Sequence, residues 1–129
     1  MKHYLVVEGH SDKTLLQALL PEGSEEDVQI VVAGGKSSAL QLANSLSVSR
    51  RSPVALVIDA DTRNEDRIRE DQLDFQDFAA ALPVETPPVL FLGIPDLETS
   101  VQNPEWVEEL LDFLTKADYA NEKPFQLRP

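Results

Sequence analysis

The stretch that decides the fold class is Pro53-Val54-Ala55-Leu56-Val57-Ile58-Asp59-Ala60-Asp61. Its apolar part, residues 54–58, has no polar alternation, which predicts a strand covered on both faces. Strands of this kind belong to parallel sheets, because the crossover helices pack on both sides of the sheet. The run ends on two carboxylates, Asp59 and Asp61, at the end of the strand where ligands of open parallel sheets collect.

Strand-like and helix-like segments alternate along the rest of the chain. Strands are predicted at 3–8, 28–33, 53–59 and 89–93, and helices at 11–20, 37–46, 64–82 and 104–117. Ser11 is expected to be the N-cap of the first helix. Four βα units in succession predict an α/β fold, a single compact domain over residues 1–129 with a mainly parallel central sheet of about four strands flanked by helices. Residues 119–129 have little periodicity and are expected to form a surface tail.

The composition limits the chemistry and the location of the protein. The chain has 129 residues, 42% of them hydrophobic and 26% charged, which is typical of one globular domain. It contains no cysteine, which excludes disulfides, cysteine-ligated zinc, iron–sulfur clusters and thiol nucleophiles. No apolar run reaches the roughly 18 residues of a membrane-spanning helix, and the start does not resemble a signal peptide. We therefore expect a cytoplasmic protein without a membrane partner.

The charge of the chain affects its possible partners. The formal net charge is −12, from 23 acidic and 11 basic residues, so the surface as a whole repels DNA and RNA. Unaided binding to nucleic acid is therefore expected to be weak. A divalent cation can invert the field locally, and a protein partner or a homo-oligomer can supply basic surface.

Acidic residues lie at the ends of two of the predicted strands. Glu8 comes directly after the apolar run 4–7, in a position that matches Asp59. Side chains at i and i+2 of an extended segment point the same way, so Asp59 and Asp61 are expected to face one cation. Carboxylate oxygens suit Mg²⁺ or Mn²⁺ better than zinc. The alternative interpretation of this acidic pair is two solvated turn residues, and the pattern alone leaves both open.

Three motifs in order give a family resemblance: Val7-Glu8-Gly9-His10-Ser11-Asp12, then Gly34-Gly35-Lys36, then Val57-Ile58-Asp59-Ala60-Asp61. Together they resemble the Toprim domain over about residues 3–100. This domain is the catalytic fold of topoisomerases, DnaG-type primases, RNase M5-like maturases and overcoming-lysogenization-defect (OLD) nucleases. The resemblance implies that Glu8 is a general acid or base and a metal ligand, and that Asp59 and Asp61 hold Mg²⁺. The interval between Glu8 and Asp12 is closer to the OLD-like nucleases, which implies that Asp12 helps to bind a second metal.

Each remaining candidate has an alternative structural interpretation. Lys36 is predicted to neutralise a phosphate during catalysis, or else to be a solvated lysine beside a helix cap. Asp12 is equally a first-turn carboxylate that the helix dipole favours. Glu98 is a candidate ligand for a second metal, and Asp96 in the same segment an alternative to it. For both acids the competing interpretation is an N-cap or an exposed loop acid.

Features that the chain lacks narrow the activities of the family. The nucleophilic tyrosine domain of topoisomerases, the zinc region of primases and the ATPase of OLD nucleases have no counterpart among these residues. We therefore expect Mg²⁺-dependent phosphodiester chemistry on DNA or RNA, in which a metal neutralises the phosphate and a carboxylate moves a proton. One alternative is a non-catalytic module that binds a metal and a phosphate or nucleotide. A third is a receiver-like domain that is phosphorylated on Asp59.

Overall fold

The predicted strands form one sheet in which every pairing is parallel. The computed structural model describes residues 2–115. Its strands are β1 (His3–Val7), β2 (Val28–Val32), β3 (Val54–Asp59) and β4 (Val89–Gly93), in the order β2-β1-β3-β4. The central strand β3 pairs with β1 on one side and β4 on the other, so that Leu56 lies between Val6 and Leu90. The α/β fold with a parallel sheet is confirmed.

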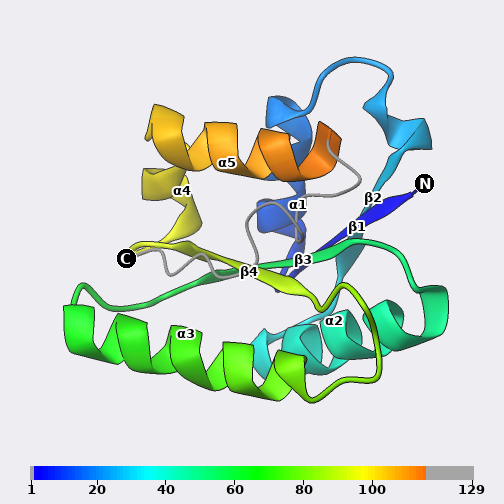
Figure 1. The fold of residues 1–129 in the computed structure, drawn as a ribbon. Helices are drawn as coiled ribbons and strands as arrows, with labels where there is room; N and C mark the ends of the chain where they lie inside the picture. The colour runs from blue at the N-terminus through cyan, green and yellow to red at the C-terminus, as the bar shows by residue number, and fades with distance from the viewer. Residues whose placement is uncertain (1, 116–129) are drawn as a thin grey trace.

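Helices cover both faces of the sheet and make a three-layer sandwich. One face carries α1 (His10–Leu19), α4 (Leu97–Ser100) and α5 (Pro104–Thr115), and the other carries α2 (Lys36–Arg50) and α3 (Glu65–Ala80) (Figure 1). A short 3₁₀ helix, η1 (Ser24–Glu26), precedes β2. Because β3 lies between these two layers, both of its faces are covered by helices and its first four residues are buried, which explains its continuous apolar sequence.

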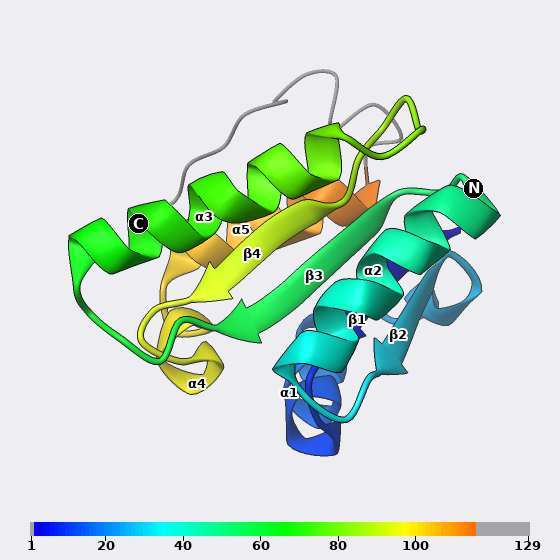
Figure 2. The same cartoon turned by 90° about the horizontal axis from the view of Figure 1, so that it is seen from below.

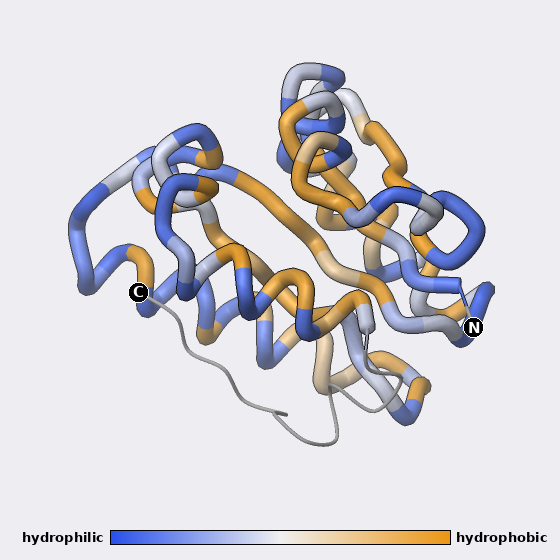
Figure 3. The backbone as a smooth tube through the Cα atoms, turned by 90° about the horizontal axis from the view of Figure 1, so that it is seen from above, coloured by the Kyte–Doolittle hydropathy of each residue, from blue (hydrophilic) through white to orange (hydrophobic). Residues whose placement is uncertain are grey.

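The pleat of the sheet divides the core into two parts. Alternate residues of the inner strands, such as Val7 and Val57, pack against α1 and α5, and their neighbours, such as Val6 and Leu56, pack against α2 and α3. All four of these side chains are buried. Figure 3 shows the strands in hydrophobic colours, while the loops and outer turns of the helices are largely hydrophilic. The strands therefore form a rigid platform whose ends present the polar loops.

Three predictions about the helices differ from the structure. The N-cap of α1 is Gly9 rather than Ser11, because Asp12 accepts a hydrogen bond from the Gly9 backbone N–H (3.1 Å) and so supplies the capping interaction. Helix α2 continues past the predicted end at residue 46 to Arg50, since Ser47 packs inside the protein as a buried polar residue. The four-residue α4 was not predicted. The predicted tail, 119–129, lies outside the described residues.

All four strands point in the same direction, so their carboxyl ends meet at one edge of the sheet. This carboxyl edge consists of the ends of the strands and the loops 8–9, 33–35, 60–64 and 94–96. It carries the acidic residues that the sequence singled out. Within residues 2–115, no helix combines the length and the apolar character that crossing a membrane requires.

Candidate functional site

The candidate site lies where the strand order reverses. From β1 the chain passes to β2 on one side of the sheet and then returns to β3 on the other side (Figure 2). Ligands of open parallel sheets bind in the crevice at such a point, outside the carboxyl ends of the strands. Glu8 follows β1 and Asp59 ends β3. Both predicted carboxylates therefore lie at the reversal point.

Glu8 is held by two neighbouring elements. Its Oε2 accepts a hydrogen bond from the backbone N–H of Asp59 (3.2 Å), and its backbone C=O accepts one from Gly34 (2.8 Å). Gly34 has φ 93°, a left-handed conformation that favours glycine, so the loop after β2 can close onto Glu8 at little cost. The glutamate is thus positioned between the ends of β2 and β3.

Asp59 is the most perturbed carboxyl group of this edge. Its Oδ1 accepts a short hydrogen bond from the backbone N–H of Leu97 (2.7 Å). Burial raises the pKa of Asp59 to about 6, and repulsion from Asp12, Glu8 and Asp61 adds to the rise, while the Leu97 N–H opposes it. Four carboxyl groups, from β3, α1 and the loops after β1 and β3, therefore share one electrostatic environment.

The loop after β4 reaches Asp59 because Gly93 has no side chain. A Cβ at Gly93 would lie only 2.7 Å from the backbone nitrogen of Leu97. Neither residue was identified from the sequence. The signal available there was a glycine at the end of an apolar strand, which suggests a close approach of another backbone segment.

Asp12 has the structural role that was given as its alternative. It occupies the first turn of α1, is half-buried, and accepts the capping hydrogen bond from Gly9. Its charge nevertheless acts on Asp59 and raises the pKa of that group. Asp12 is thus close enough to contribute to the field of the site while its Oδ2 caps the helix.

Asp61 differs from the prediction made for it. Strand β3 ends at Asp59, and the chain turns at Asp61, which has φ 58° and donates its backbone N–H to Pro95 C=O (2.9 Å). The predicted extended geometry over 59–61 is therefore wrong, because the hydrogen bond to the loop after β4 replaces the strand. The Asp61 carboxylate instead forms an exposed ion pair with Lys36 Nζ (2.9 Å).

The acidic segment after β4 is divided between a cap and a surface residue. Asp96 is the N-cap of α4 and accepts a hydrogen bond from the Thr99 backbone N–H (2.8 Å). Hydrogen bonds from the Thr99 side chain and backbone lower the pKa of Asp96. The N-cap interpretation is confirmed for Asp96. Glu98 is exposed in the first turn of α4, and no hydrogen bond or ion pair within residues 2–115 joins its carboxylate to Glu8, Asp59 or Asp61.

The donor set of this site suits a hard cation. Glu8, Asp12, Asp59 and Asp61 offer carboxylate oxygens only, which is the chemistry that Mg²⁺ and Mn²⁺ prefer. Within residues 2–115, however, no three acidic or histidine side chains stand close enough together to hold an ion as they are. Ligation of an ion by three of these residues would require side-chain rotation, and ligation by Asp61 would require its release from Lys36.

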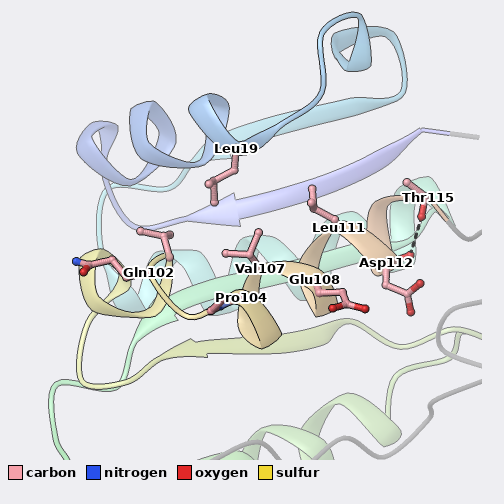
Figure 4. Close-up of a pocket in the computed structure, with 9 residues that line it drawn as sticks. Leu19, Gln102, Pro104, Val107, Glu108, Leu111, Asp112 and Thr115 are labelled. Atoms are coloured by element: carbon pink, nitrogen blue, oxygen red, sulfur yellow. Dashed lines mark hydrogen bonds between the residues drawn. The ribbon is translucent and has the colours of Figure 1, made fainter.

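Two hollows lie on opposite faces of the sheet. A groove of about 580 Å³ runs between α2 and α3, and Lys36, Asp59 and Asp61 line one end of it. A hollow of about 540 Å³ lies between α1 and α5, where Leu19 faces Val107 and Leu111 (Figure 4). Of the described residues that line this second hollow, none belongs to the predicted site. Of these two hollows, as the described residues form them, the groove beside α2 and α3 is continuous with the carboxylates.

Comparison with known proteins gives one family. No curated protein and no solved structure matches the chain. The family described as "Protein of unknown function (DUF3226)" matches residues 2–115, which include every strand and helix described above. The chain therefore belongs to the DUF3226 family.

Proposed function

We propose that this protein is a Toprim-like, Mg²⁺-dependent enzyme that cleaves phosphodiester bonds in nucleic acid, with its site at the carboxyl edge. The hydrogen bond between Glu8 Oε2 and the Asp59 backbone N–H carries the proposal. It joins the Glu8 carboxylate to the backbone of Asp59 at the kind of position where ligands of open parallel sheets collect.

Asp59 and Asp61 would hold the metal together with Glu8. The hydrogen bond from Gly34 and the contact with Asp59 fix Glu8. Asp59 uses Oδ1 for Leu97, and its Oδ2 is left for a ligand. Mutual repulsion of the carboxylates disfavours their joint ionisation without a counter-charge, so a cation stabilises the ionised set. When bound, Mg²⁺ supplies the positive charge that a phosphate needs during attack.

Proton transfer falls to Glu8 in this proposal. Attack of water forms a new bond to phosphorus and breaks the bond to the leaving oxygen, so one proton must leave the water and one must reach the leaving group. Glu8 would take or give one of these protons, and solvent water would exchange the other. The Glu8 carboxyl is half-buried, and a backbone N–H holds it in position for this role. A bound metal ion would replace Lys36 as the partner of Asp61. Lys36 would then be free to bind a phosphate oxygen of the substrate.

The proposal is tested by incubating labelled single-stranded and duplex DNA and RNA with the full chain in Mg²⁺, Mn²⁺ or EDTA. We expect metal-dependent cleavage that falls by at least about 100-fold in Glu8→Gln, the range for loss of one acid–base group. The matched control is Glu85→Gln, which removes an exposed carboxylate from the loop before β4, at the opposite edge of the sheet. Equal cleavage by both variants would contradict the role of Glu8.

The strand order favours a second candidate. Receiver domains have the order 2-1-3-4-5, and the order here, β2-β1-β3-β4, matches its first four strands. Asp59 would then be a phosphoacceptor at the end of β3, with Lys36 beside it. Incubation with acetyl phosphate and Mg²⁺ separates the receiver-like domain from the nuclease. Only a receiver-like domain gains the mass of one phosphoryl group, roughly 80 Da, and Asp59→Asn should abolish this gain.

A non-catalytic module is the remaining alternative. The ion pair between Lys36 and Asp61 is compatible with it, since a site that opens only for a ligand can bind without turnover. Metal binding together with intact oligonucleotides after prolonged incubation would support this alternative over cleavage.

A further inference from the structure

The groove between α2 and α3 is a candidate ligand pocket that extends beyond the residues of the proposed cleavage site. Its volume of about 580 Å³ lies within the usual range for small-molecule sites. Apolar side chains of the sheet, including Ile58, Leu90 and Leu92, form its floor. Figure 2 shows β3 in the space between the two helices. A ligand there would rest on the sheet and reach the carboxylates at one end.

The groove carries charged side chains of both signs. Lys36 and Ser37 begin α2 and form one wall beside the carboxyl edge, where the helix N-terminus adds positive potential. The α3 wall carries Arg67 and, further along the helix, Asp71 and Asp74, all three exposed. The pocket thus offers positive charge at Lys36 and Arg67, acceptors at Asp71 and Asp74, and an apolar floor.

An aromatic side chain completes the α3 wall. Phe78 is 58% exposed, the largest exposure among the large hydrophobic residues that the structure describes. It lies one helical turn beyond Asp74 on the same side of α3 and lines the groove. An exposed aromatic ring at a pocket wall offers a surface on which a planar group can stack.

We propose that this groove binds the base of an unpaired nucleotide whose phosphate lies at Lys36; the inference rests on the proposed function. A nucleotide is complementary to the groove, because it has an anion at one end for Lys36, a flat apolar ring, and N–H donors on the edge of the base. Those donors would meet Asp71 or Asp74. In a duplex they are already used in pairing, so the substrate is a single strand or an unpaired end.

The same contacts predict a base preference. A carboxylate accepts two adjacent donors at once, and guanine presents two on its pairing edge, at N1 and N2. Guanine is therefore bound most tightly. A basic amphipathic peptide would also satisfy Asp71 and Asp74, but its cations would meet Lys36 and Arg67, which line the same groove. Asp59 and Asp61 line it as well, and Mg²⁺ held by them would offset their charge. With the metal in place, Lys36 and Arg67 favour a nucleotide over a basic peptide.

The test is equilibrium binding of guanosine and uridine 5′-monophosphates and inorganic phosphate to the full chain in Mg²⁺, measured by calorimetry. We expect guanosine monophosphate to bind more tightly than phosphate, and Phe78→Ala to weaken it about 5- to 100-fold, as for loss of one stacking partner. Asp71→Asn/Asp74→Asn should remove the preference for guanosine over uridine. The control is Leu73→Ala, which truncates another exposed apolar residue of α3 outside the groove.

Four results would overturn the inference. The first is equal affinity for guanosine monophosphate and for phosphate, and the second is an equal effect of Phe78→Ala and Leu73→Ala on the affinity for guanosine monophosphate. The third is a wild-type dimer that Phe78→Ala dissociates. The fourth is binding of a synthetic Lys/Leu amphipathic peptide in place of the nucleotide. Failure of the proposed function looks different. Guanosine monophosphate would still bind in a Phe78-dependent way, while oligonucleotides stayed intact and Mn²⁺ did not bind. Cleavage that does not depend on the base would refute base binding in the groove and leave the proposed cleavage function intact.

Discussion

Replacing Asp59 by asparagine should stabilise the metal-free protein at alkaline pH. The amide oxygen of asparagine can still accept the Leu97 N–H, and the change removes the charge that burial and three neighbouring carboxylates disfavour. The pKa of Asp59 rises from 3.8 to about 6 on folding. At 1.36 kcal/mol per pKa unit, the full cost of ionisation is about 3 kcal/mol. Because this carboxyl is partly exposed, solvent screening reduces the expected gain to about 1 kcal/mol.

The gain should depend on pH in one direction. Between pH 3.8 and about 6 the folded wild type holds more protons than the unfolded chain, so its free energy of unfolding falls as the pH rises through this window. Asp59→Asn lacks this loss. The variant should therefore exceed the wild type in stability above pH 7 and match it below pH 4.

Urea unfolding in EDTA at pH 4, 5, 6, 7 and 8, followed by circular dichroism, measures this difference. In a thermal melt at pH 8, the same difference of about 1 kcal/mol corresponds, for a domain of this size, to a melting temperature roughly 3–5 °C higher in the variant than in the wild type. Glu85→Gln is the control for the loss of one negative charge. A gap that stays constant from pH 4 to pH 8, or a variant no more stable than the wild type at pH 8, would refute the reasoning.

Three further substitutions test other contacts. Gly93→Ala should lower the free energy of unfolding by about 2–3 kcal/mol in a urea titration, because the new methyl group would overlap the Leu97 backbone. A loss below about 0.5 kcal/mol would show that the loop after β4 moves freely. Trp106→Phe should lower the free energy of unfolding by about 1–2 kcal/mol, since the Leu92 carbonyl of the edge strand β4 loses the indole N–H that donates to it (2.9 Å). An unchanged urea midpoint would contradict this. Lys36→Met should change stability by less than about 1 kcal/mol, because its ion pair is exposed. The same variant should raise Mn²⁺ affinity, because it frees Asp61, and weaker Mn²⁺ binding in calorimetry would argue against that competition.

The sheet could be predicted because its strands are locally distinctive. Continuous apolar runs separated by amphipathic segments fix both the strand positions and the parallel arrangement, and these need no tertiary information. The N-cap of α1 was missed because a serine is the commoner cap, whereas here the third residue of the helix, Asp12, supplies the bond to a glycine. Helix α2 was predicted too short, because its last turn buries Ser47 where the pattern expects an apolar residue.

The candidate site could be predicted in location but not in detail. Glu8 and Asp59 were placed at one edge from the direction of their strands, and they are joined by a hydrogen bond. The ion pair of Lys36 with Asp61 connects residues 25 positions apart and depends on the left-handed turn at Asp61. The contact from Leu97 likewise depends on the loop after β4. The groove combines residues of α2, α3, β3 and β4, so no local pattern revealed it.

The central claim is that the carboxyl edge binds a divalent metal for chemistry on a phosphate. Calorimetric titration of Mn²⁺ into the wild type, Asp59→Asn/Asp61→Asn and Glu85→Gln tests it most directly. We predict one saturable binding event, unchanged in Glu85→Gln and abolished in the double variant. Absence of binding to the wild type, or equal binding to all three proteins, would contradict the claim and assign these carboxylates a structural role.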